Sequence, residues 1–126
     1  MTTHAIATKE IIVCDDDEDI LEYLRVLLLT EGYTPLIARG MYDVFPYIRN
    51  NEPRLLLLDI RMPEYDGFEV AETLRRNGVQ MPIIFLTAHD NMFSRVYSPL
   101  VGATGFFTKP IDANALLERI RQIIPN

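Results

Sequence analysis

The sequence lacks the features that mark membrane and secreted proteins. Its longest unbroken apolar stretches are about four residues, as in VLLL at 26–29, whereas a helix that spans a bilayer needs about 20. No stretch resembles the apolar part of a secretory signal peptide. We therefore expect a cytoplasmic protein with no membrane partner.

Cysteine and clustered positive charge are also scarce. The single cysteine, Cys14, excludes an intramolecular disulfide. Because Cys14 stands in an apolar run, we interpret it as a packed strand residue rather than a reactive thiol. The formal net charge is -6, and the 12 lysines and arginines form no cluster. This charge balance argues against nucleic acid or an anionic membrane as a direct partner.

What the sequence does contain is a regular alternation of short apolar runs and helical patterns. With 126 residues, of which 48% are hydrophobic, the chain suffices for a single domain with one core at about 10–124 and an N-terminal tail at 1–9. Gly, Pro, Asn and Asp mark the joints between the segments. The expected strands lie at 10–14, 34–38, 54–58, 82–87 and 105–108, and a helical pattern follows each, the last at 113–124.

Two prolines constrain the second strand and the helix after it. Pro35 removes a backbone donor from the strand at 34–38, which predicts that this strand lies at an edge of the sheet. Pro46 is tolerable only if the next helix begins around 43–45, because the proline then occupies the first turn, where backbone N–H groups have no helical partner.

A third proline falls in the fourth helical pattern. Inside a helix, Pro99 would cost roughly 3 kcal/mol, so we expect this helix to be short, kinked or displaced, and the segment 90–104 to be the most mobile ordered part of the chain. Phe93 and Tyr97 fit core packing at helical spacing. Together with Met92 they also suit an interaction face, but core packing is our expectation for the two aromatic residues.

Five strands that are apolar on both faces, each followed by a helix, predict an α/β fold with a parallel sheet covered on both sides. Right-handed crossovers bring the carboxyl ends of all the strands to one edge of the sheet. Ligands of such sheets bind at that edge. The polar residues that end or directly follow the strands are therefore candidates for one shared site: Asp15, Asp16, Asp59, Thr87 and Lys109.

These residue types suit phosphoryl transfer to a carboxylate. Three neighbouring carboxylates repel one another, and without compensation at least one has a raised pKa. A bound cation removes the conflict, and Mg²⁺ commonly takes one or two carboxylates and a phosphate oxygen. Lys109 adds a positive charge and Thr87 a hydroxyl, which suit an anion arriving on Asp59. In such chemistry, positioning and charge neutralisation supply most of the catalysis.

Four motifs in this order resemble the receiver domain of two-component response regulators, the CheY-like superfamily. They are IIVCDDD at 11–17, LLLLDIRMPEYDG at 55–67, IIFLTA at 83–88 and GFFTKP at 105–110. The resemblance implies a flavodoxin-like, doubly wound (βα)5 fold with strand order 2-1-3-4-5. It also implies a phosphoacceptor switch rather than an enzyme, limited to self-phosphoryl transfer and autodephosphorylation.

By the same resemblance, Asp59 accepts a phosphoryl group from a sensor histidine kinase or a histidine phosphotransfer protein in a reaction that depends on Mg²⁺. The metal ligands would be Asp16, Asp59 and the backbone carbonyl of Arg61. Asp15 would help directly or through water.

The resemblance also assigns the switch. Thr87 would turn toward the phosphoryl group, Phe106 would be the rotating aromatic residue, and Lys109 would pair with the phosphoryl group. The Lys109–Pro110 peptide would be cis, which X-Pro bonds allow at modest cost. A downstream protein partner or a self-dimer would use the face formed by 90–124.

Several acidic and loop residues have a simpler interpretation. Asp17 and Asp19 suit the N-terminus of a helix, where the dipole favours negative charge. Asp66 and Gly67 form a turn and a helix start. His89, two residues after Thr87, is interpreted either as a solvent-facing loop residue or as a control on water access to the phosphoryl group.

Arg61 and two other function classes complete the sequence-based hypotheses. Arg61, two residues after Asp59, would brace or shield the phosphoryl group. The Asp-x-Asp at Asp15 and Asp17 resembles the nucleophile motif of haloacid-dehalogenase-type phosphatases, but that family places Thr or Ser where this chain has Asp19. A pseudo-receiver that binds partners without phosphorylation is the remaining alternative, and the presence of all five site residues argues against it.

Overall fold

We describe the protein from a computed structural model, and the structure describes residues 8–88 and 91–125. Strands and helices alternate in the order β1 (Glu10–Cys14), α1 (Glu18–Thr30), β2 (Thr34–Ala38), α2 (Met41–Asn50), β3 (Leu55–Asp59), α3 (Gly67–Arg76), β4 (Ile83–Thr87), α4 (Met92–Leu100), β5 (Ala103–Thr108) and α5 (Ala113–Ile123). The five strands form one parallel sheet in the order β2-β1-β3-β4-β5. The predicted fold class and strand order are confirmed.

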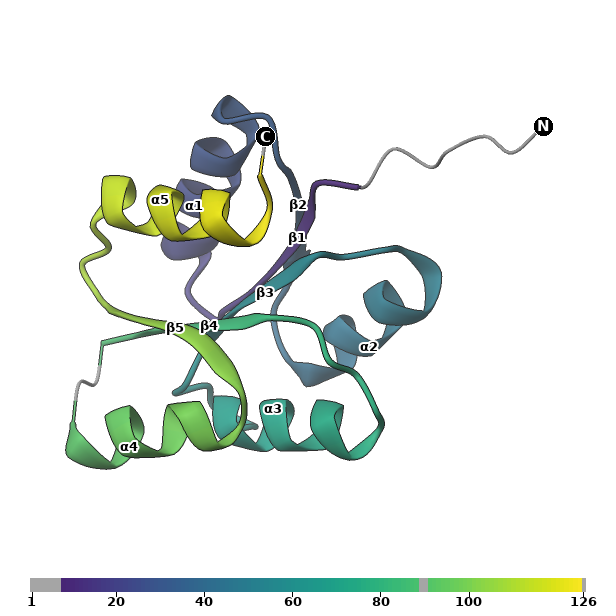
Figure 1. The fold of residues 1–126 in the computed structure, drawn as a ribbon, viewed down its shortest axis with the longest axis vertical. Helices are drawn as coiled ribbons and strands as arrows, with labels where there is room; N and C mark the ends of the chain where they lie inside the picture. The colour runs from purple at the N-terminus through teal and green to yellow at the C-terminus, as the bar shows by residue number, and fades with distance from the viewer. Residues whose placement is uncertain (1–7, 89–90, 126) are drawn as a thin grey trace.

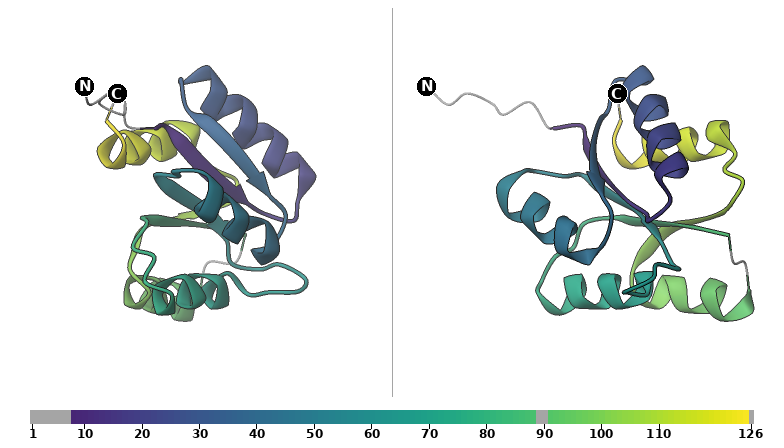
Figure 2. Two further views of the ribbon diagram at one scale, coloured as in Figure 1. Left: turned by 90° about the vertical axis from the view of Figure 1, so that its right-hand side faces the viewer. Right: turned by 180° about the vertical axis from the view of Figure 1, so that it is seen from behind.

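The helices cover both faces of the sheet. Helices α1 and α5 lie on one face, and α2, α3 and α4 lie on the other (Figures 1 and 2). Strand β3 shows why the sequence requires this arrangement, because its side chains alternate between the two faces. Leu55 and Leu57 pack in the hydrophobic cluster beneath α1 and α5, whereas Leu56 and Leu58 pack in the cluster beneath α2, α3 and α4.

Cys14, the last residue of β1, lies in the cluster beneath α2, α3 and α4 and is 1% exposed. In the sheet it is paired with Ala38 on one side and Leu58 on the other. Burial, and then the charge of Asp15, raises the pKa of the Cys14 thiol to about 12. The interpretation of Cys14 as a packed strand residue is confirmed.

Local capping interactions determine where α1 and α3 begin. The side chain of Asp17 accepts a hydrogen bond from the backbone N–H of Asp19 at 2.9 Å and caps α1. The side chain of Asp66 accepts from the N–H of Phe68 at 2.7 Å and caps α3. The interpretations of Asp17 and of the Asp66-Gly67 pair as helix starts are therefore confirmed.

The outcomes for Pro35 and Pro46 differ. Strand β2, which contains Pro35, lies at an edge of the sheet, as predicted. The predicted start of α2 is wrong, because the helix begins at Met41 and Pro46 is its sixth residue. The early start has a local cause: the carboxylate of Asp43 accepts a hydrogen bond from the N–H of Arg39, and Met41 packs against the core.

Helix α4 is short, as predicted, with nine residues, and Pro99 lies at its next-to-last position. The prediction that Phe93 packs in the core is wrong, because its side chain is 67% exposed. Ser94 and Ser98 face the protein interior instead, and Tyr97 packs against the core from its flank, as expected. The error arises because α4 carries two stripes of helical period, one apolar and one of small residues, and the small residues allow the helix to lie close to the sheet.

The described helices include none that is both long enough and apolar enough to cross a membrane.

Candidate functional site

The candidate residues gather at the carboxyl edge of the sheet because every strand runs in the same direction. Asp15 follows β1, Asp59 ends β3, Thr87 ends β4 and Lys109 follows β5. The strand register aligns these ends: Asp59 pairs with Leu86, the residue before Thr87. Residues far apart in the sequence are thereby brought to one place.

Asp15, Asp16 and Asp59 form a compact acidic cluster. Each offers one carboxylate oxygen, and these oxygens all lie within 4.8 Å of one another. Asp15 and Asp59 are buried, whereas Asp16 is exposed. Burial, followed by the negative charge of Asp15, raises the pKa of Asp59 to about 6. The cluster has the charge and the oxygen donors that a hard divalent cation requires.

Lys109 partly neutralises this cluster. Its Nζ lies 2.8 Å from Oδ2 of Asp15 and 3.6 Å from Oδ2 of Asp59. Burial alone would lower the pKa of Lys109, but the hydrogen bond to Asp15 and the two carboxylate charges raise it above its ordinary value. The backbone N–H of Lys109 donates to the carbonyl of Thr87 at 2.8 Å, and the Lys109–Pro110 peptide is cis, as predicted.

Both carboxylate oxygens of Asp15 are engaged in hydrogen bonds. Oδ1 accepts from the N–H of Asp17 at 2.9 Å, and Oδ2 accepts from Lys109. Asp16, in contrast, is exposed and lines a surface hollow of about 360 Å³. The structure thus presents Asp16 as the more open of the two carboxylates that follow β1.

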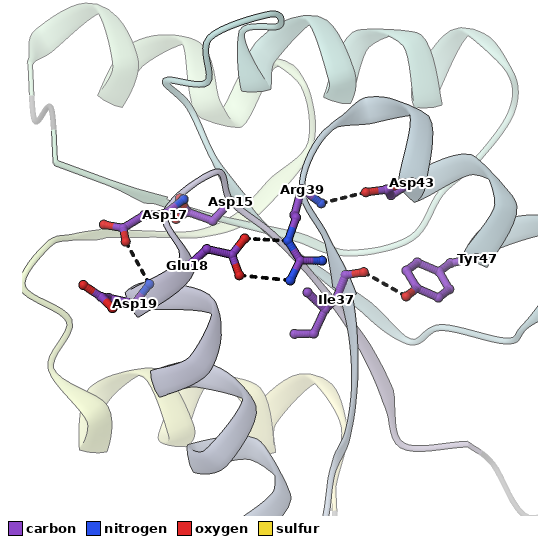
Figure 3. Close-up of polar contacts among 8 residues, drawn as sticks. All are labelled: Asp15, Asp17, Glu18, Asp19, Ile37, Arg39, Asp43 and Tyr47. Carbon is purple, nitrogen blue, oxygen red and sulfur yellow. Dashed lines mark hydrogen bonds and ion pairs between the residues drawn. The ribbon is translucent and has the colours of Figure 1, made fainter.

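The start of α1, which carries this acidic turn, is tied to the end of β2. Figure 3 shows the guanidinium of Arg39 facing the carboxylate of Glu18. The guanidinium donates two hydrogen bonds to this carboxylate, at 2.5 and 2.9 Å. On the other side of Arg39, its backbone N–H donates to Asp43 at the start of α2. Because both side chains of the Arg39–Glu18 pair are exposed, the pair adds little stability.

Two features that follow Asp59 could not be predicted from the sequence. The backbone N–H of Arg61 donates to the Asp59 carboxylate and thereby opposes the rise in its pKa. Gly67 packs so tightly that a Cβ atom there would lie 2.3 Å from the carbonyl oxygen of Asp59. Neither feature has a side-chain signal: the first is a backbone group, and the second is an absent side chain.

The expected switch residues lie on the neighbouring strands β4 and β5. Thr87 is fully buried at the end of β4. Phe106 is half-buried and packs in the cluster beneath α2, α3 and α4, with the guanidinium carbon of Arg95 5.0 Å from its ring centroid. Phe107 packs on the opposite face of the sheet. His89 lies outside the described residues, so its role stays a prediction.

Comparisons with known proteins agree on one family. The family model for the response regulator receiver domain matches residues 11–121. The response regulator MprA of Mycobacterium sp. (strain KMS) is 38% identical over 114 residues, which cover 90% of this chain and 50% of that protein. The chain therefore spans about half the length of the response regulators to which it is similar.

Solved structures agree with the sequence matches. A CheY-like response regulator receiver domain protein from Methanospirillum hungatei JF-1 aligns with a TM-score of 0.84 and 31% identity, covering 91% of this chain and 92% of that one. The beryllofluoride-activated NtrC4 receiver domain dimer aligns with a TM-score of 0.85 and 28% identity, covering 92% and 96%. The chain belongs to the family of response regulator receiver domains, which act in two-component signalling systems.

Proposed function

We propose that Asp59 is the phosphoacceptor of this receiver domain. The observation that carries the proposal is the position of its carboxylate, which is buried within the acidic cluster and lies 3.6 Å from the ammonium group of Lys109. An oxygen of Asp59 attacks the phosphorus of a phosphohistidine, a new O–P bond forms, and the N–P bond of the donor breaks. The bonding electron pair stays on the imidazole nitrogen, which leaves as a neutral ring after taking up a proton.

The donor set of the site fits Mg²⁺. Asp15, Asp16 and Asp59 supply carboxylate oxygens within reach of one another, and the backbone carbonyl of Arg61 is proposed as a further ligand. When bound, the ion neutralises charge on the phosphoryl oxygens. The raised pKa of Asp59 supports the same assignment, because a nearby cation favours the charged carboxylate that acts as the nucleophile.

Lys109 and Thr87 are proposed to respond to the new phosphoryl group. Phosphorylation adds roughly -1.5 to -2 charge and three acceptor oxygens. Lys109, already 3.6 Å from Asp59, pairs with this charge. Thr87 turns its hydroxyl toward the phosphoryl oxygens, and Phe106 moves inward as Thr87 withdraws from its resting position. Arg61, whose side chain is exposed two residues after Asp59, shields the phosphoryl group.

The proposed partners follow from this chemistry. The phosphoryl group comes from a sensor histidine kinase or a histidine phosphotransfer protein, and the domain itself performs only self-phosphoryl transfer and autodephosphorylation. A downstream protein or a second copy of the chain binds the face at 90–124. The exposed apolar side chains of α4 support such a contact; they are Met92, Phe93, Val96 and Leu100.

Phosphodonor labelling tests the assignment of Asp59. Incubation with acetyl phosphate and Mg²⁺ is expected to add one phosphate by intact mass, and Asp59→Asn should abolish the addition. Glu64→Gln is the matched control, because Glu64 is an exposed carboxylate on the same loop. Labelling of Asp59→Asn to a full equivalent would refute the proposal.

Removal of the metal tests the proposed requirement for Mg²⁺. EDTA should stop labelling of the wild-type chain, and added Mg²⁺ should restore it. An unchanged rate in EDTA would refute the Mg²⁺ assignment while leaving Asp59 as the acceptor. A wild-type chain that takes up no phosphate and binds no beryllofluoride with Mg²⁺ would favour the pseudo-receiver alternative.

A further inference from the structure

The carboxyl end of α4 is fixed by one arginine from a neighbouring helix. Arg75, near the end of α3, donates from Nε to the carbonyl of Val101 at 2.9 Å and from Nη2 to the carbonyl of Gly102 at 3.2 Å. Its Nη1 donates to the carbonyls of Val79 and Met81, each at 2.9 Å. The rigid guanidinium therefore joins the end of α4 to the segment that enters β4.

Gly102 completes this anchor. Its φ of +76° is unfavourable for other residues, and a Cβ atom there would lie 3.3 Å from the Arg75 guanidinium. The close approach of the two groups therefore depends on glycine. Arg75 is half-buried, and this burial lowers the pKa of its guanidinium.

The preceding part of α4, Met92–Ser98, is held differently. Its buried side chains are Ser94 and Ser98, which are small and polar. Its apolar contacts with the core are those of the half-buried Tyr97 and the largely exposed Phe93 with the ring of Phe68. The hydroxyl of Tyr97 donates to the carboxylate of Glu72 on α3. This part of the helix is thus held by one side-chain hydrogen bond to α3, whereas Arg75 joins four backbone carbonyls.

Pro99 separates the two parts. Proline has no N–H, so the helical hydrogen bond from residue 99 to the carbonyl of Arg95 does not form. After Pro99 the backbone hydrogen bonds join residues three apart. The N–H of Val101 donates to the carbonyl of Ser98 at 3.3 Å, and the N–H of Gly102 donates to the carbonyl of Pro99 at 3.0 Å. The helix is thus weakest at the point where the anchored turn begins.

We propose that α4 is a hinged helix, in which Arg75 fixes the turn at 99–102 and the segment Met92–Ser98 opens about a joint at Pro99. This divides residues 92–102 into a mobile part and a fixed turn. The mobile part begins at Met92, only five residues after Thr87. The hinge itself does not depend on phosphorylation; its use in signalling rests on the function proposed for Asp59.

Residue-level amide exchange of the resting protein, measured by NMR, tests the hinge without any phosphodonor. In the wild type, the amides of Val96, Tyr97 and Ser98 should exchange faster than those of Val101 and Gly102. Arg75→Met should speed exchange at Val101 and Gly102 by about tenfold, because it removes several hydrogen bonds, and should change the other three amides by less than about twofold.

Arg76→Met is the matched control, because the Arg76 guanidinium is exposed and donates to Thr73 on its own helix. It should leave all five amides unchanged. Equal acceleration of all five amides in Arg75→Met would show that α4 opens as one unit and would overturn the proposal. Unchanged exchange at Val101 and Gly102 would overturn the anchor.

Pro99→Ala tests the joint and remains informative even if Arg75→Met fails to fold. The substitution restores a backbone N–H at residue 99, so the mobile part becomes coupled to the fixed turn. Exchange at Val96, Tyr97 and Ser98 should slow by about tenfold and approach the rates at Val101 and Gly102. Exchange as fast as in the wild type would overturn the joint at Pro99.

Discussion

Two junctions of this domain have the same plan and opposite packing. In each, a strand ends in a polar residue, a loop follows, and a capped helix has phenylalanine as its second residue. At the β3–α3 junction, Phe68 is 5% exposed, whereas at the β4–α4 junction Phe93 is 67% exposed. The first junction holds Asp59 and Gly67 in a buried backbone contact, and the second leads into Met92–Ser98, the mobile part of the proposed hinge in α4.

The comparison shows what helical periodicity leaves undetermined. Both helices carry an apolar stripe, but only α3 turns that stripe toward the sheet. In α4 a second stripe, with Ser94 and Ser98, faces inward, and the apolar residues remain on the surface. The period of a stripe predicts that a helix forms, while close packing against neighbours decides which of two stripes is buried.

The largest expected difference between the junctions is in the two phenylalanines. Phe68→Ala should lower the free energy of unfolding by about 3–5 kcal/mol, because it opens a cavity beside the rings of Phe85 and Tyr97. Phe93→Ala should lower it by less than about 1 kcal/mol, because the side chain is largely in solvent. Urea unfolding of both variants measures the difference. Equal losses would contradict the exposed position of Phe93.

The first residues of the two helices provide the next comparison. Gly67→Ala should destabilise the protein by about 2–3 kcal/mol, because the new methyl group meets the backbone of Asp59 and Ile60 and the loop has to shift. Met92→Ala, at the matching position of α4, should change stability by less than about 0.5 kcal/mol, since Met92 is 81% exposed. Backbone chemical shifts of Asp59 would record the displacement. A Gly67→Ala protein with native shifts and stability would show that the contact is loose.

The charge at the end of β3 should make the first junction sensitive to pH. A pKa of about 6 in the folded state exceeds the ordinary value of 3.8, so the folded protein binds the proton more tightly and the ionised carboxylate opposes folding. Asp59→Asn should therefore raise the free energy of unfolding by about 2 kcal/mol above pH 6, with the gain vanishing below pH 4.

The control for this pH dependence is Glu64→Gln, an exposed carboxylate on the loop after Asp59. Its effect should stay within about 0.5 kcal/mol from pH 4 to pH 8. Denaturant unfolding without Mg²⁺ across this range measures both curves. A stabilisation by Asp59→Asn that is equally large at pH 3.5 would assign the effect to something other than ionisation.

The smallest predicted effect concerns the hydrogen bond between Tyr97 on α4 and Glu72 on α3. Tyr97→Phe removes the hydroxyl that donates to Glu72 and should destabilise the protein by about 1 kcal/mol. Tyr23→Phe on α1, an exposed tyrosine far from this contact, should change stability by less than about 0.5 kcal/mol. Thermal unfolding of the two variants measures this difference in stability. Identical melting temperatures for Tyr97→Phe and the wild type would show that the bond adds nothing in water.

The sequence allowed the fold to be predicted because its apolar runs and joints are regular. Strands such as Leu55–Asp59 are apolar on both faces and have one plausible place, in the middle of a covered parallel sheet. The polar residues at strand ends could then be placed at one edge. Their individual roles remain predictions, although the structure brings Asp15, Asp16 and Asp59 together.

What the sequence did not reveal depends on distant contacts or on backbone groups. The start of α2 at Met41 depends on an interaction between Asp43 and Arg39, which Pro46 alone could not indicate. The contact between Gly67 and Asp59 requires the helix to be placed against the strand before it can be seen. A glycine in a sequence can indicate either a turn or a close packing contact, and the sequence alone does not distinguish the two.

The single thiol of the chain is a natural reporter of how often the core beneath α2, α3 and α4 opens. Cys14 is 1% exposed in that core, and its pKa of about 12 keeps the thiol protonated, so a disulfide reagent reacts with molecules in which this packing has opened. The rate of that reaction, divided by the rate for the unfolded chain, gives the fraction of molecules in which the thiol is accessible. The wild-type protein thus offers a measure of core opening without a label or a substitution.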